Sequence, residues 1–214
     1  MPKDVMARLA HALGRRDEVP NVELAEALAL RPDGAAVQVL VDHLADKNAA
    51  IRSDCIKVLY ELGERKPAQI APHVEVFLTL LAAKDNRLQW GAMTALSAIA
   101  MGQLQHEILA RHVDRFVDAA DQGSVITRDR AVLTLAALAA NAKHSKRALP
   151  LLFDQVLRSP VNQLPMYAEA TLPVIGKKDR ARFVEILEVR MSEALPPAKR
   201  KRLENVLKKL AKQA

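Results

Sequence analysis

The sequence predicts an all-α protein built from repeated pairs of helices. Half of its 214 residues are hydrophobic, yet only 3% are aromatic and seven are glycine. The core must therefore consist of Ala, Leu, Val and Ile, a composition that favours helix. Apolar residues recur at helical spacing, and the same pattern returns after 37 and then 39 residues. These observations predict an α–α superhelix, a right-handed solenoid of about five to six helix pairs.

Three segments carry the repeat most clearly, and they start at Val37, Val74 and Val113. Each contains two amphipathic helices joined by a short polar turn. The residues on the shared apolar stripe are Leu40, Phe77 and Phe116; Val41, Leu78 and Val117; Leu44, Leu81 and Ala120; Cys55, Ala92 and Ala131; Leu59, Leu96 and Leu135; and Leu62, Ile99 and Leu138. We expect these side chains to be buried, because one helix pair cannot cover its own apolar stripe.

Weaker copies flank these three segments. A copy that starts at Met6 places Leu9, Ala10, Leu13, Leu24 and Leu28 at the same offsets, and another starts at Phe153. A last helix pair is expected after residue 178, with Phe183, Ile186, Leu187 and Met191 on the stripe of its first helix. We therefore predict a single domain over residues 1–214, with repeats near 3–30, 34–63, 71–102, 109–141 and 149–176 and capping helices over 178–214.

Glycine and proline predict where the helices end and begin. Gly63, Gly102 and Gly176 stand where helices should stop, and we expect them to form left-handed caps. Pro150 is expected at a helix start. Pro173 falls inside a predicted helix, which it should kink or break because it lacks a backbone N–H.

Polar residues at one position of the repeat link the chain to a known family. Arg52 in "AAIRSDCIKVL" and Arg128 in "ITRDRAVLTL" stand fifteen residues after their repeat starts, and Gln89 replaces arginine in the middle copy. Asp46 and Asp85 precede this position in the connecting turns. Helix pairs that repeat every 37–39 residues with this polar pattern resemble the HEAT-repeat family of HEAT-like and armadillo-type α-solenoids. The resemblance implies an Asp–Arg ladder between repeats and a concave surface lined by the second helices.

The same resemblance favours a non-enzymatic scaffold or adaptor that binds a protein or peptide on its concave face. Residues of the second helices that lie off the buried stripe are the candidates for partner binding: Arg87, Trp90, Thr94, Asp54, Lys57 and Arg130. Trp90, the only tryptophan, is interpreted in two ways. It is either an exposed anchor of the kind enriched at interfaces, or a side chain that fills the gap at Gly91 or packs against the adjacent repeat. Arg87 is either a second anchor or a solvated charge whose stem lies on the indole.

The formal charge of +7 arises entirely from residues 177–214, which hold 12 basic and 5 acidic residues, while residues 1–176 sum to zero. The last 19 residues, "PPAKRKRLENVLKKLAKQA", also carry an apolar helical stripe at Leu203, Val206, Leu207 and Leu210. This segment is interpreted either as a cap alone or as a cap that also binds phosphate, nucleic acid or an acidic protein. The candidate residues of this basic patch are Lys199, Arg200, Lys201, Arg202, Lys208 and Lys212.

The sequence shows no motif for catalysis, for a cofactor or for a metal ion. The six histidines have no ligand spacing, and Cys55, the single cysteine, is expected to be buried and inert. An alkylbase DNA glycosylase built from HEAT-like repeats is kept as an alternative, with Asp54, Trp90 and Tyr60 as its candidate residues. No apolar run approaches the roughly 20 residues of a membrane span, so we expect a cytoplasmic protein without membrane contact. The oligomeric state is not predicted.

Overall fold

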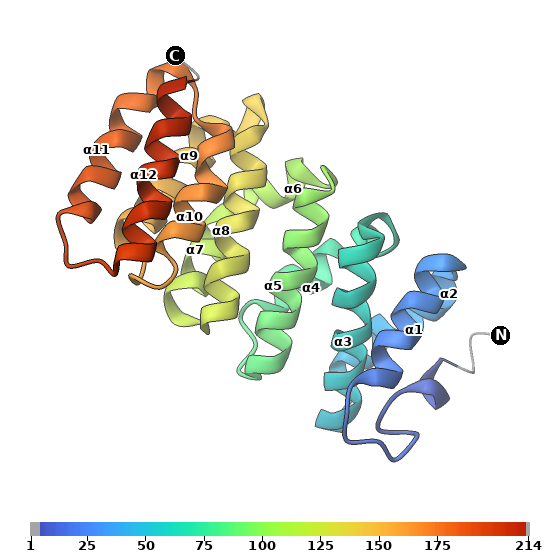
Figure 1. Ribbon diagram of the computed structural model, residues 1–214. Helices are drawn as coiled ribbons and strands as arrows, with labels where there is room; N and C mark the ends of the chain where they lie inside the picture. The colour runs from blue at the N-terminus through green and yellow to red at the C-terminus, as the bar shows by residue number, and fades with distance from the viewer. Residues whose placement is uncertain (1–4, 213–214) are drawn as a thin grey trace. The chain divides into compact units, whose positions relative to one another are not determined.

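The computed structural model describes residues 5–212 and contains, within that range, twelve α-helices, several short 3-10 turns and no strand (Figure 1). The chain divides into two compact units, Met1–Thr134 and Leu135–Ala214. The boundary falls inside α8 (Val125–Ala140).

Unit 1 contains two complete antiparallel helix pairs followed by a third that ends at the unit boundary. The pairs are α2 (Gly34–Asp42) with α3 (Ala49–Arg65), α4 (Val74–Leu80) with α5 (Asn86–Met101), and α7 (Val113–Gln122) with the start of α8. A further helix, α1 (Val19–Leu30), packs against α3, and α3 packs against α5, so that these three lie in a row (Figure 1). We call the surface formed by α1, α3, α5 and the start of α8 the second-helix face.

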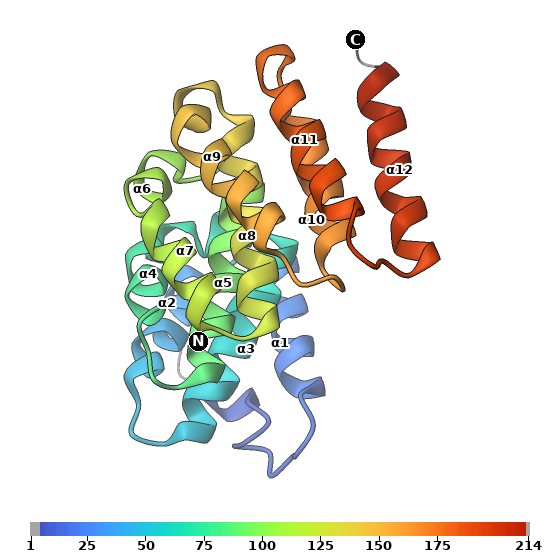
Figure 2. The same ribbon diagram turned by 90° about the vertical axis from the view of Figure 1, so that its left-hand side faces the viewer.

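Unit 2 repeats this plan with two helix pairs. They are α9 (Ala142–Arg158) with α10 (Leu164–Thr171), and α11 (Arg180–Met191) with α12 (Pro197–Lys212). First helix packs on first helix and second on second, since α9 contacts α11 and α10 contacts α12. Figure 2 shows α10, α11 and α12 side by side.

The predicted apolar stripe forms the core. Of the eighteen stripe positions in the three clear repeats, all are buried except Val117, which is partly exposed. Cys55 is fully buried, as expected. In α12, Leu203, Val206 and Leu210 are buried and Leu207 partly so. The helical period in the sequence therefore predicts correctly which face of each helix packs inward.

The predicted Asp–Arg ladder is present between the α2/α3 pair and the α4/α5 pair. The Arg52 guanidinium donates to the Asp85 carboxylate at 3.1 Å and to the backbone carbonyls of Asp46 and Lys47. Asp85 also caps α5 by accepting from the N–H groups of Arg87 and Leu88.

The equivalent polar side chains tie each second helix to the end of its own first helix. Gln89 Nε2 donates to the Leu81 carbonyl at 3.0 Å, and Arg128 Nε donates to the Ala120 carbonyl at 3.0 Å. The polar side chain at this repeat position thus donates to backbone carbonyls at the C-terminal end of the first helix, where such carbonyls lack partners within the helix.

The expected glycine caps are wrong in their conformation. α3 continues past Gly63 to Arg65, and Gly63 is buried inside the helix, where a Cβ would overlap the Ile70 side chain. Gly102 does end α5, but its φ is −72°, and Gly176 has a φ of −77°. At α5 the left-handed residue is Gln103, with a φ of 59°.

Of the two proline predictions, one is wrong and one is confirmed. Pro150 lies inside α9 and not at its start, because Asn141 caps the helix earlier by accepting from the Lys143 N–H. Pro173 behaves as predicted: α10 ends at Thr171, and Leu172–Val174 forms a 3-10 turn.

The segment before α1 is not the helix expected from the weak first repeat. Only Met6–Arg8 forms a 3-10 turn, and Gly14 has a left-handed φ of 65°. Leu13 is 55% exposed and does not belong to the core, in contrast to the prediction. The helix α6 (His106–Arg111) is an additional element that the repeat pattern does not predict.

Candidate functional site

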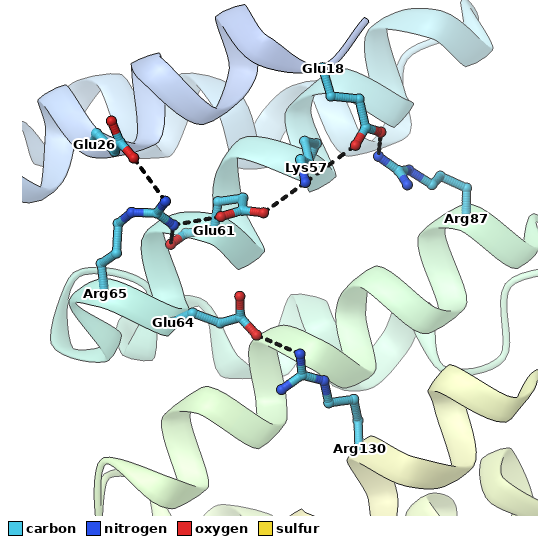
Figure 3. A network of polar contacts seen from close by, with 8 residues as sticks. All are labelled: Glu18, Glu26, Lys57, Glu61, Glu64, Arg65, Arg87 and Arg130. Carbon is cyan, nitrogen blue, oxygen red and sulfur yellow. Dashed lines mark hydrogen bonds and ion pairs between the residues drawn. The ribbon is translucent and has the colours of Figure 1, made fainter.

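The second-helix face of unit 1 carries six ion pairs, five linked in one chain and one separate, which we together call the charge ladder. It consists of four acids and four bases: Glu18, Glu26, Lys57, Glu61, Glu64, Arg65, Arg87 and Arg130 (Figure 3). The pairs are Glu18–Arg87, Glu18–Lys57 at 3.2 Å, Lys57–Glu61 at 2.7 Å, Glu61–Arg65 at 2.5 Å, Glu26–Arg65 at 3.1 Å and Glu64–Arg130 at 2.5 Å. Its four negative and four positive formal charges sum to zero.

Lys57 and Glu61 form the buried centre of the ladder, with side chains that are 11% and 15% exposed. Burial by itself would lower the pKa of Lys57, but its contacts with Glu61, Tyr60 and Glu18 outweigh burial and raise it. Burial would likewise raise the pKa of Glu61, but the hydrogen bonds from Lys57 and Arg65 lower it. Both side chains are therefore charged at neutral pH, and each keeps the other so.

An aromatic cluster of Tyr60 and Trp90 lies beside the ladder. The ring centroids are 5.3 Å apart, with the planes tilted by 51°. The Arg87 guanidinium carbon lies 4.5 Å from the Trp90 centroid, and the Lys57 ammonium lies 4.9 Å from the Tyr60 centroid. Tyr60 is buried and Trp90 is half-buried, so the indole is held by neighbours on two sides and still reaches the surface.

These contacts exclude one of the roles considered for Trp90 and support packing on an adjacent repeat. The space at Gly91 is occupied by Ile56, whose Cγ1 would lie 2.5 Å from a Cβ placed there, so Trp90 is not the side chain that fills it. Trp90 does pack on an adjacent repeat, the preceding one, through Tyr60 of α3, but remains partly exposed. Arg87 pairs with Glu18 while its guanidinium lies over the indole.

Two of the ladder pairs connect helices that are not neighbours in the repeat order. Glu64 on α3 pairs with Arg130 on α8, although α5 is the second helix of the repeat between them. Glu18 at the start of α1 pairs with Arg87 on α5, although α3 lies between those helices. The long Glu and Arg side chains of these two pairs therefore meet across a middle helix on the second-helix face (Figure 3).

No protein-family model and no curated protein matched the chain. Solved structures do match. An engineered protein superposes with a TM-score of 0.63 at 20% identity, over 98% of this chain and 97% of its own. Computationally designed armadillo repeat proteins for modular peptide recognition superpose with a TM-score of 0.64 at 17% identity, over 97% and 98%.

The fold is that of the HEAT/armadillo-type α-solenoids. A natural protein shares it: Kap121p, in its complex with Pho4p, matches 95% of this solenoid with 23% of its own chain, at a TM-score of 0.60 and 16% identity. The predicted all-α superhelix class is thus confirmed.

The other residues predicted to bind a partner are buried or engaged in contacts within the protein. Thr94 is 2% exposed and donates to the Trp90 carbonyl, so it cannot contact a partner, in contrast to the prediction. Lys57 is nearly buried and acts within the ladder. Arg130 is partly exposed and is held by Glu64.

Asp54 secures the N-terminal segment of the solenoid. Its carboxylate accepts from the His11 N–H at 2.7 Å and from the Asn21 amide at 2.8 Å, and Asn21 in turn accepts from the Ala10 N–H. Because both carboxylate oxygens serve this structural role, the glycosylase alternative gains no support from Asp54. Asn21 was missed in the sequence, although it stands fifteen residues after Met6, the offset at which the other repeats carry Arg or Gln.

The basic patch of unit 2 is partly used within the solenoid itself. Lys199 contacts Asn162, Arg200 donates to the Met191 carbonyl at 2.8 Å, and Arg202 pairs with Glu169. Lys201, Lys208 and Lys212 are exposed.

Within residues 5–212, a metal-ligand group and a membrane-spanning helix are both absent. No group of three or more His, Cys, Asp or Glu side chains could hold a metal ion. No helix in the same range is long and apolar enough to span a bilayer.

Proposed function

We propose that this chain is a scaffold that binds a polypeptide segment of a partner protein on the second-helix face of unit 1. The observation that carries the proposal is Trp90, which is partly exposed on the second-helix face and is held in place by Tyr60 and Arg87. An aromatic ring whose orientation is already set loses little conformational entropy on binding, which is why Trp and Arg dominate interface energies.

The charges of the face indicate which kind of segment fits. One designed armadillo repeat protein was solved in complex with the peptide (KR)4. In the present chain the four ladder acids are each paired with a base, so a purely basic segment finds no free carboxylate there. We propose instead a segment whose apolar or aromatic side chain packs on Trp90, with polar groups of either sign alongside.

The test uses Trp90 as its own reporter, because it is the only tryptophan. A random peptide library is selected on the immobilised protein, and the selected peptides are titrated against the free protein by tryptophan emission. Trp90→Phe keeps an aromatic ring, and for it and for Trp90→Ala the affinity is measured by calorimetry.

Trp90→Ala should weaken the selected peptides by more than about 1 kcal/mol, whereas Trp90→Phe should lose less. Val76→Ala is the control, since Val76 is an exposed apolar residue on α4, outside the second-helix face. Peptides that bind Trp90→Ala as tightly as the unmodified protein, or a selection that enriches none, would contradict the proposal.

A further inference from the structure

Helix α12 in unit 2 has two chemically distinct faces. Its apolar face, formed by Leu203, Val206 and Leu210, is buried where α12 contacts α10 and α11. Its opposite face carries exposed basic residues at helical spacing: Lys201, Lys208, Lys209 and Lys212. Burying the apolar stripe is enough to attach the helix, and it does not require this accumulation of charge.

Part of the basic face forms the wall of a depression of about 380 Å³ between α10 and α12. Glu169 and Leu172 line it from the side of α10, and Arg202, Lys208, Lys209 and Lys212 line it from α12. Arg202 and the three lysines face a single carboxylate, so the depression has an excess of positive charge.

That single carboxylate is already engaged. Glu169 accepts two hydrogen bonds from the Arg202 guanidinium, at 2.8 and 2.6 Å. These bonds lower the pKa of Glu169, and Lys209 adds to the effect. Lys208, Lys209 and Lys212 make no ion pair within the described part of the chain. The depression is therefore an anion-accepting surface in which an internal acid holds one of the four cations.

The lining favours an acidic polypeptide over a nucleic acid. Leu172 and Val206, both largely buried, form the apolar base of the depression. No aromatic side chain lines the depression to stack on a base. Residues 1–176 carry no net charge, so the excess of positive charge that a phosphate backbone would need is confined to residues 177–214.

We propose that the depression between α10 and α12 binds an acidic polypeptide segment, rich in Asp and Glu, and that Glu169 competes with this segment for Arg202. The site lies in unit 2, and the peptide site proposed around Trp90 lies in unit 1. The two proposals therefore stand or fall separately.

The competition by Glu169 makes the proposal testable beyond simple charge attraction. Glu169→Gln releases Arg202, so a fluorescein-labelled octa-glutamate peptide should bind at least about threefold more tightly, as measured by fluorescence anisotropy at low salt. Glu204→Gln makes the same charge change on α12 outside the depression and should alter the affinity much less. Equal tightening in both variants would show a general field effect and would overturn the proposed competition.

The lysines are tested with a matched pair of triple variants. Lys208→Gln, Lys209→Gln and Lys212→Gln together should weaken the octa-glutamate peptide by at least about tenfold. The control replaces the exposed lysines Lys47, Lys66 and Lys84 of unit 1 by Gln, with the same change of net charge. Equal losses in the two triple variants would refute a site in unit 2.

A single-stranded oligonucleotide of the same charge is measured in parallel. It should bind more weakly than the peptide; tighter binding that responds to the same variants would assign the depression to nucleic acid and overturn the proposal. Because all the replaced lysines are exposed, circular dichroism should show unchanged helix content. Trp90→Ala should leave octa-glutamate binding unchanged, which separates this site from the proposed function.

Discussion

Gly63→Ala is expected to destabilise unit 1, although alanine is the better helix former. Gly63 lies in α3, where replacing glycine by alanine gains up to about 1 kcal/mol. An added Cβ, however, would overlap Cδ1 of the buried Ile70 and lie 3.3 Å from its Cγ1 and 3.5 Å from Ala98 Cβ. Such overpacking costs about 1–3 kcal/mol, so the free energy of unfolding should fall by about 0–2 kcal/mol.

A second substitution isolates the cause. Ile70→Val removes Cδ1 and should by itself cost about 0.5–1.5 kcal/mol. In the double variant the new Cβ occupies the space that Cδ1 vacates. The two changes should therefore couple favourably by about 1 kcal/mol or more, and the double variant should be at least as stable as Ile70→Val alone.

Urea unfolding followed by tryptophan emission measures this cycle, because the single tryptophan lies in unit 1. Gly34→Ala is the control: nothing lies within 4 Å of a Cβ at Gly34, which is the first residue of α2. It should not destabilise, and its effect should add to that of Ile70→Val. Additive effects of Gly63→Ala and Ile70→Val would refute the packing argument.

Three further predictions concern single buried groups. Burial raises the pKa of the Cys55 thiol to about 12, so Cys55 should react with a thiol reagent at pH 8 only as fast as unit 1 opens, as followed by mass spectrometry. The pKa of Glu61 is lowered from its ordinary value of 4.5, so the stabilisation from its ionised carboxylate is complete above pH 4.5 and is lost as the pH falls through the lowered pKa. Glu61→Gln should therefore make the free energy of unfolding depend less on pH in the acid range, as measured by urea unfolding at several pH values. Asn21→Ala leaves the buried Ala10 N–H without an acceptor, should cost about 1–3 kcal/mol, and should speed hydrogen exchange in residues 5–15 more than in α9–α12. An unchanged exchange rate in that segment would show that Asn21 does not hold it.

The sequence predicts the core well and the surface contacts poorly, for a physical reason. Burial depends on the period of one helix, so residues such as Leu59 and Leu96 can be assigned without knowing where the next helix lies. An ion pair such as Glu64–Arg130 depends on how successive repeats are staggered, which local spacing does not encode. Trp90 is intermediate: its position off the stripe was clear, but its stacking on Tyr60 was not.

The errors at glycine and proline have a similar origin. A glycine in a helical pattern is compatible with a cap or with a close approach of another element, and Gly63 proved to be the second. Pro150 favours a helix start by local propensity, although Asn141, a better N-cap, stands nine residues earlier. Local propensity cannot choose between these possibilities, because the tertiary contact decides.

The two ion pairs that skip a helix change how unit 1 is expected to unfold. In a one-dimensional repeat array, stability is approximately a sum of terms for each repeat and for each adjacent interface. Glu18–Arg87 and Glu64–Arg130 add second-neighbour terms to that sum, each of about 0–1 kcal/mol for partly exposed pairs. Unravelling α5 alone would break both pairs, since one ends on α5 and the other spans it. Opening at the centre is thereby penalised relative to opening at the ends, and the middle of unit 1 should melt as one cooperative block.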